Sequence, residues 1–183
     1  MLRLNKLLYS SVENDVFYDR IQPNAEQRQH LAKCKNDIRD HLRPRIRKAT
    51  VEMLGMERVI DPRFRTQGSW SYATCIQPAF QPPQQMDWDF GVYLPVSVWE
   101  DNGPPMQMAR AYFDLVEHLL ADLCHEKQWK LISGKDTCIR VQVANWAHID
   151  IPLYAAPEAQ FRQIMEKALL ESRSLTRTLH AHD

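Results

Sequence analysis

The sequence reads Gln67-Gly-Ser-Trp-Ser-Tyr72 and, after a proline-rich connection, Met86-Asp-Trp-Asp-Phe-Gly-Val-Tyr-Leu94 in the region that organises the rest of the chain. In the second segment apolar side chains alternate with Asp87 and Asp89, which is typical of a β-strand. Alternate side chains of a strand share one face, so both carboxylates lie on the same face, about 7 Å apart along the strand. Two unpaired carboxylates in an apolar core would be very costly. This face is therefore expected to be solvated or to hold cations.

An Asp-x-Asp pair alone is a weak signal, because it arises often by chance and usually marks a solvated surface. Two further features favour a metal site. Gly68-Ser69 is expected to open a short helix after a strand that ends near Thr66, and the N–H groups at a helix N-terminus bind phosphate. Asp150 lies in a second alternating segment and faces away from the apolar side chains of that segment, as the other two aspartates do.

Length and composition limit the classes of protein. A chain of 183 residues is one domain that can bury a substantial core. The 23 Lys+Arg residues balance 23 Asp+Glu, so no overall basic field is available for long nucleic acid, and a small nucleotide fits better. The four cysteines are scattered, which indicates neither a zinc site nor a disulfide framework and favours a reducing cytoplasm. The first nine residues are too few and too charged for a signal peptide or a membrane span.

A long helix is expected to begin after Pro23, because Asn24 is a suitable N-cap and Gln27 follows three residues later. Pro44 is expected to kink this helix or to divide it. The helix also carries a basic cluster that suggests nucleic-acid binding, but interleaved acidic residues favour a solvated face. The cluster consists of Arg39, Arg43, Arg45, Arg47 and Lys48.

The second half of the sequence predicts a helix, two strands and a last helix. The turn Asn102-Gly-Pro-Pro105 precedes a helix that runs to about Lys127. Residues 138–143 and 149–153 alternate and predict a hairpin-like strand pair. A final helix is expected from Pro157. The fold class is mixed α/β (α+β), with a small mixed sheet flanked by helices that include the long N-terminal one.

Three carboxylates that converge from neighbouring strands are typical ligands of hard cations, so two Mg²⁺ or Mn²⁺ ions are predicted at Asp87, Asp89 and Asp150. Two such ions hold the attacking and leaving oxygens of an in-line phosphoryl displacement. Gly68 and Ser69 would hold the outer phosphates of a nucleoside triphosphate. The predicted reaction is nucleotidyl transfer with release of pyrophosphate. This hypothesis requires the three aspartates to lie together and none of them to be ion-paired inside the protein.

Five separated motifs, in the same order, resemble the cGAS/DncV-like nucleotidyltransferases over about residues 9–171. The motifs are Arg63-Phe-Arg-Thr-Gln-Gly-Ser-Trp-Ser-Tyr72, Pro78-Ala-Phe-Gln-Pro82, Gln85-Met-Asp-Trp-Asp89, Lys135-Asp-Thr-Cys138 and His148-Ile-Asp-Ile-Pro-Leu-Tyr-Ala155. The resemblance implies the polymerase-β-like nucleotidyltransferase fold and the same metal and phosphate ligands. It also implies that Gln67 and Tyr72 line the nucleotide pocket and that Arg140 lies near the acceptor base.

Members of this family make cyclic di- or oligonucleotide messengers in bacterial antiphage (CBASS) defence, so the resemblance implies ATP and GTP as substrates and CBASS accessory proteins as partners. It assigns residues 1–183 to a catalytic lobe, with an arm and helix over 1–58, the sheet over 59–156 and a helix over 157–183. Family members continue into a second, helical lobe, and without it weak or absent cyclase activity is expected. The alternatives are a minimal nucleotidyltransferase that modifies a protein or small molecule, and a non-catalytic nucleotide-binding module.

Overall fold

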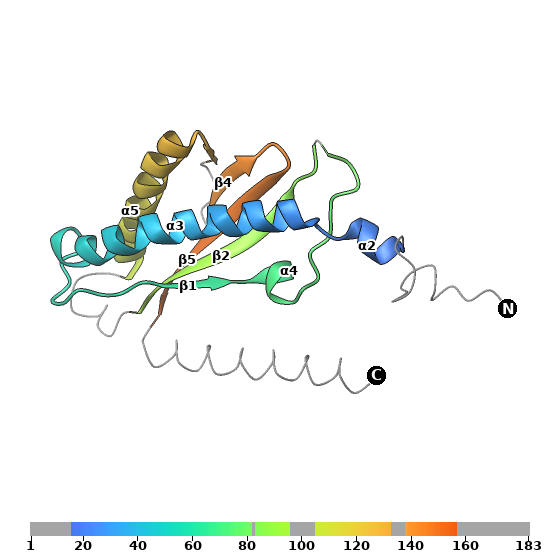
Figure 1. Ribbon diagram of the computed structural model, residues 1–183. Coiled ribbons are helices and arrows are strands. Elements are labelled where there is room, and N and C mark those ends of the chain that lie inside the picture. The colour runs from blue at the N-terminus through green and yellow to red at the C-terminus, as the bar shows by residue number, and fades with distance from the viewer. Residues whose placement is uncertain (1–15, 82, 96–104, 133–137, 157–183) are drawn as a thin grey trace, which may run out of the picture.

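A five-stranded mixed sheet with two long helices on one of its faces forms the centre of the protein (Figure 1). The computed structural model describes residues 16–81, 83–95, 105–132 and 138–156. The elements are α2 (Phe17–Ile21), α3 (Ala25–Glu52), β1 (Arg63–Thr66), α4 (Gly68–Ser71), β2 (Met86–Pro95), α5 (Pro105–Lys127), β3 (Lys130–Ile132), β4 (Cys138–Ala144) and β5 (Ala147–Ala156). This architecture confirms the predicted small mixed sheet flanked by helices.

The strands lie in the order β1-β2-β5-β4-β3, and the central pair β2 and β5 is parallel. The chain leaves β2, forms α5, β3 and β4, and returns as β5 beside β2. The pairs β1–β2, β4–β5 and β3–β4 are antiparallel, which confirms the predicted hairpin of residues 138–143 with residues 149–153. β3 was not predicted, because its three residues are too few to show an alternating pattern.

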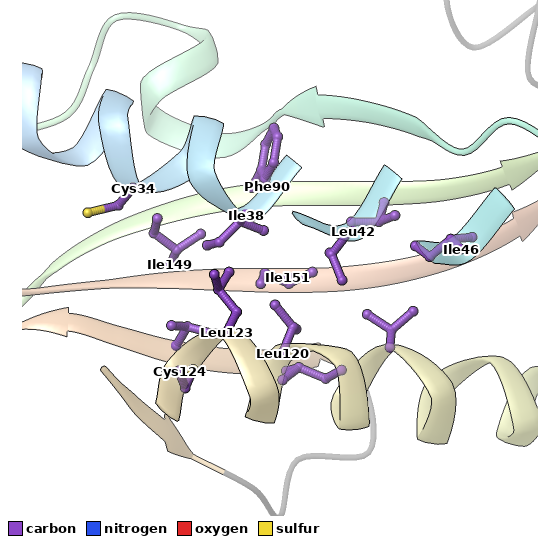
Figure 2. Packing of buried hydrophobic residues seen from close by; sticks show 14 of the residues in the cluster. Cys34, Ile38, Leu42, Ile46, Phe90, Leu120, Leu123, Cys124, Ile149 and Ile151 are labelled. Carbon is purple, nitrogen blue, oxygen red and sulfur yellow. The ribbon is translucent and has the colours of Figure 1, made fainter. Parts of the chain in front are cut away.

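The core lies between the sheet and the two long helices, as Figure 2 shows. The apolar side chains of the strands face the helices. They alternate with the acidic side chains, which therefore lie on the opposite face of the sheet. The side chains that meet there include Ile38, Leu42 and Ile46 of α3, Leu120 and Leu123 of α5, Phe90 of β2, and Ile149 and Ile151 of β5. The predicted segregation of apolar and acidic side chains onto opposite faces is therefore confirmed.

The start of α3 is fixed by the predicted capping box. The Asn24 side chain accepts a hydrogen bond from the Gln27 backbone N–H at 2.8 Å, and the Gln27 side chain accepts one from the Asn24 N–H at 2.9 Å. These two bonds satisfy N–H groups that have no partner within the helix. The chain therefore enters α3 at a defined position, directly after the buried Pro23.

Replacing Asn24 by alanine is expected to lower the free energy of unfolding by about 1 kcal/mol, because an N-cap side chain is lost. Asn36 lies inside the same helix, and Asn36→Ala is expected to be neutral or slightly stabilising because alanine has the higher helix propensity. Urea denaturation followed by circular dichroism measures both variants. Equal losses in the two variants would contradict a capping role.

Pro44 lies inside α3, and the helix is continuous from Ala25 to Glu52, so the predicted division of the helix is wrong. Proline has no N–H, so the backbone carbonyl four residues before Pro44 loses its helical hydrogen bond. Pro44 is exposed, so this carbonyl lies on the solvent side of the helix, where water can donate a hydrogen bond to it. Leu42 and Ile46, on either side, are fully buried against the sheet and hold both halves in place. Tertiary packing therefore outweighs the local cost of the proline.

Two predicted segments, the arm before residue 16 and the helix from Pro157, lie outside the described residues. Within the ranges that are described, no helix combines the length and the apolar character that crossing a membrane requires.

Candidate metal and nucleotide site

The parallel pairing of β2 with β5 brings the predicted acidic residues together. Asp89 lies directly opposite Asp150, and Asp87 lies directly opposite His148. All four side chains belong to the polar face of the sheet, because they alternate with the apolar residues of their strands that pack in the core. The predicted proximity of the two acidic strands follows from this register.

Asp87, His148 and Asp150 each offer a ligand atom, and these atoms lie within 4.8 Å of one another. His148 and Asp150 are buried, whereas the side chain of Asp87 is 46% exposed. Asp89 is not part of this group in the described structure, and its carboxylate lies against Gly68. The expected three-aspartate cluster therefore has Asp89 at its edge and a histidine within it. Sequence reasoning missed His148, although its position two residues before Asp150 in one strand places it on the same face.

The Asp89 carboxyl is in an environment that disfavours its charge. Burial raises the pKa of this group, and the neighbouring carboxylates of Asp87 and Asp150 raise it further. Nearby positive groups oppose the shift only in part. A cation bound among these carboxylates would offset their repulsion, so the electrostatics of the polar face fit a divalent metal ion.

Asp150 is ion-paired with Arg140 of the neighbouring strand, contrary to the expectation that no aspartate of the site is paired. The guanidinium donates from Nε to one carboxylate oxygen at 2.6 Å and from a terminal nitrogen to the other at 2.7 Å. The hydrogen bond to Asp150 also raises the pKa of Arg140. Each carboxylate oxygen has a second lone pair, so the pairing orients Asp150 without using all of its capacity to bind a cation. The predicted contact of Arg140 with a base stays a prediction.

The turn between β1 and α4 needs glycine at position 68. Gly68 has a φ of +58°, in the left-handed region, and it opens α4 as predicted. A Cβ atom at this position would overlap Oδ2 of Asp89. The backbone of the Gly-Ser turn therefore lies directly against a predicted metal ligand, and Ser69 follows it as the second residue of α4.

Trp70 joins α4 to the strand that carries the acidic pair. Its indole stacks on Trp88 with ring centroids 4.2 Å apart, and its Nε1–H donates to the backbone carbonyl of Asp87 at 2.8 Å. Lys35 of α3 lies over the Trp88 ring, 5.1 Å from its centroid. The glycine–serine turn and the acidic strand are thus held as one unit, which limits the movement of the predicted phosphate and metal ligands relative to each other.

The two residues predicted to line the nucleotide pocket differ in their surroundings. The Gln67 side chain donates to the hydroxyl of Tyr93 and accepts from the hydroxyl of Tyr154 at 3.4 Å. The two tyrosine rings stack with centroids 4.6 Å apart. Tyr72 is 57% exposed at the end of α4. Gln67 is therefore fixed by the polar face of the sheet, Tyr72 is accessible, and their nucleotide contacts remain predictions.

The curated relatives of this chain include cyclic GMP-AMP synthases of two organisms. The cyclic GMP-AMP synthase of Vibrio cholerae serotype O1 is 35% identical over 155 residues, which cover 84% of this chain and 32% of that protein. A cyclic GMP-AMP synthase of Escherichia coli strain TW11681 is 39% identical over 104 residues, which cover 56% of this chain and 23% of that protein. The chain thus spans about a third or less of the length of these curated relatives.

Solved structures of the Vibrio cholerae dinucleotide cyclase share the fold. The structure of a variant in complex with ATP and GTP superposes with a TM-score of 0.70 at 26% identity, covering 91% of this chain and 54% of that chain. The GTP-bound form gives a TM-score of 0.67 at 26% identity, covering 84% and 52%. The predicted polymerase-β-like nucleotidyltransferase fold is confirmed by these superpositions.

The family described as "Cyclic GMP-AMP synthase DncV-like, nucleotidyltransferase domain" matches residues 62–154. The matched segment is more than half of the 183-residue sequence, and it contains the glycine–serine turn, the Asp-x-Asp strand and Asp150. The chain therefore belongs to the DncV-like nucleotidyltransferase family.

Proposed function

We propose that this chain is the nucleotidyltransferase part of an enzyme that joins nucleoside triphosphates into a cyclic di- or oligonucleotide and releases pyrophosphate. The observation that carries the proposal is the parallel register that sets Asp89 beside Asp150, with the backbone of Gly68 against the Asp89 carboxylate. ATP and GTP are the proposed substrates, because related structures contain them. A role in CBASS signalling in the cytoplasm, with accessory proteins and a second lobe, follows from the resemblance alone.

The residues present fit divalent cations. Oδ1 of Asp87 is buried and has no hydrogen-bond partner among the described residues. Burial raises the pKa of Asp89, and the carboxylates of Asp87 and Asp150 raise it further. Asp87, Asp89 and Asp150 would hold two Mg²⁺ or Mn²⁺ ions. When bound, the ions would supply charge neutralisation and a lowered pKa for the attacking hydroxyl.

The chain's own groups would position the substrates. The backbone N–H groups of Gly68 and Ser69 would bind the outer phosphates, and the stacked Trp70 would keep this turn at a fixed distance from β2. Arg140 orients the Asp150 carboxylate through two hydrogen bonds. Such positioning is the main contribution that a protein makes to phosphoryl transfer.

Binding of ATP or GTP is expected to require Mg²⁺ or Mn²⁺ and to weaken at least about tenfold in Asp89→Asn, since changes to groups that merely support a metal ligand already cost about tenfold to a hundredfold. Asp122→Asn, an exposed position on α5, is the matched control and should bind as the wild type does. Calorimetry with and without the metal ion measures both.

Incubation with labelled ATP and GTP then separates the kinds of product. A phosphatase-resistant nucleotide supports the cyclase, whereas label transferred to a protein or small molecule supports the alternative modifying enzyme. Nucleotide affinity that is unaffected by both the metal ion and Asp89→Asn would overturn the proposal.

A further inference from the structure

We infer that His148 and Asp87 together bind a divalent first-row transition metal ion, with Nε2 of His148 as one of its ligands. The two residues lie directly opposite each other on the parallel strands β2 and β5. The inference rests on the proposed function, because the ion would serve the same site. It goes further in giving the site a nitrogen ligand beside the carboxylates.

The orientation of the Gln85 amide fixes which nitrogen of His148 carries hydrogen. Nε2 of Gln85 donates to the backbone carbonyl of Asn145 at 3.1 Å, so the amide oxygen is the end that faces His148. This oxygen lies 3.0 Å from Nδ1 of His148. An amide oxygen only accepts hydrogen bonds, so Nδ1 must be the donor. In the neutral imidazole, Nε2 then has a free lone pair.

Nε2 of His148 faces Oδ1 of Asp87 at 3.2 Å, and His148 is only 6% exposed. Both atoms are buried, and neither has a hydrogen-bond partner among the described residues. While His148 is neutral, two lone pairs face each other at this distance and repel, whereas a proton on Nε2 would form an ion pair with Asp87. Buried polar atoms without partners are also costly. A cation shared by the two atoms removes both costs.

The separation of the two atoms suits coordination of one ion. Two ligands that lie about 2.1 Å from one ion, at a right angle, are about 3.0 Å apart. The Nε2–Oδ1 distance is 3.2 Å, and a ligand atom of Asp150 lies within 4.8 Å of both. A hydrogen bond from Nδ1 to an amide or carboxylate oxygen is the usual support of a metal-binding histidine, and Gln85 supplies it here.

The donor set points to a class of metal ion. An imidazole nitrogen is a ligand of transition metals, whereas Mg²⁺ prefers oxygen ligands and several waters. A site with one imidazole and two carboxylates should therefore bind Co²⁺ and Mn²⁺ more tightly than Mg²⁺. This preference should be larger than that of a site made of carboxylates alone. This preference concerns which ion the site binds. It does not change the proposed role of Asp87, Asp89 and Asp150 in the reaction.

Pulsed electron paramagnetic resonance of Mn²⁺ bound to the full chain tests the ligand directly. Coupling to an imidazole ¹⁴N is expected in the wild type and in His118→Gln, an exposed histidine on α5, and it should be absent in His148→Gln. In calorimetry, Co²⁺ affinity should fall at least about tenfold in His148→Gln, with a smaller loss for Mg²⁺. Gln85→Leu should weaken Co²⁺ binding about tenfold to a hundredfold.

Bound Mn²⁺ without nitrogen coupling in the wild type would overturn the inference, even if His148→Gln fails to fold. If Mn²⁺ binding without nitrogen coupling is abolished in Asp89→Asn, the proposed function stands, and only the assignment of His148 as a ligand is wrong. Absence of any Mn²⁺ binding by the wild type, with and without ATP, would overturn both the inference and the proposed metal dependence.

Discussion

Replacing Arg140 by methionine is expected to lower the free energy of unfolding by about 3 kcal/mol, the lower end of the cost of breaking a buried ion pair. The side chain of Asp150 is 11% exposed and that of Arg140 is 25% exposed, so the carboxylate would stay buried after its partner is lost. Methionine retains much of the apolar volume of the arginine stem. Urea denaturation measures the loss.

Arg110→Met provides the matched control. Arg110 pairs with Asp114 at 2.9 Å on α5, with side chains that are 69% and 53% exposed, so its removal should change stability by less than about 1 kcal/mol. The double variant Arg140→Met/Asp150→Leu should recover most of the loss, because neither charge of this pair remains. A similar loss from Arg140→Met and from Arg110→Met would show that the Asp150 carboxylate is not effectively buried.

Replacing Gly68 by alanine is expected to reduce metal-dependent nucleotide binding at least about tenfold and to destabilise the fold by about 1 to 2 kcal/mol. The strain arises because the residue has a φ of +58°. The loss of binding arises because the added Cβ must displace the Asp89 carboxylate, which it would otherwise overlap. Urea denaturation and calorimetry with ATP and Mg²⁺ measure the two effects.

Gly55 separates the two causes. It has a φ of +63°, and a Cβ added there would meet no atom within 4 Å. Gly55→Ala should therefore show a comparable loss of stability, with unchanged nucleotide affinity. If Gly68→Ala binds ATP and metal as tightly as Gly55→Ala does, the contact between the turn and Asp89 has no part in the site.

Alternation along the chain was sufficient to predict much of this fold. It placed Asp87, Asp89 and Asp150 on the polar sides of their strands, and the capping box located the start of α3. The parallel pairing of β2 with β5 was not predictable in the same way, since the choice of a strand partner depends on packing between segments far apart in the sequence. Pro44 shows the same limit, because buried neighbours outweigh a local preference.

Two features of the site were within reach of the sequence and were missed. A hairpin that turns near Asn145 sets Arg140 opposite Asp150, so the ion pair follows from the predicted strands. His148 shares the face of Asp150 by the same alternation. The link from His148 through Gln85 to the Asn145 carbonyl was out of reach, because it joins the residue before β2, β5 and the turn before β5 through side-chain geometry.

The chain returns to the side of β2 only when it forms β5, and this order has a consequence for biosynthesis. While the chain emerges from the ribosome, β2 has an open edge on the side of β5 until α5, β3 and β4 have followed. Unpaired edges of this kind are prone to aggregation, and pairing between distant segments is slow to form. The carboxylates converge only when β5 docks beside β2, so uptake of a divalent ion would report that the sheet of the nascent domain has closed.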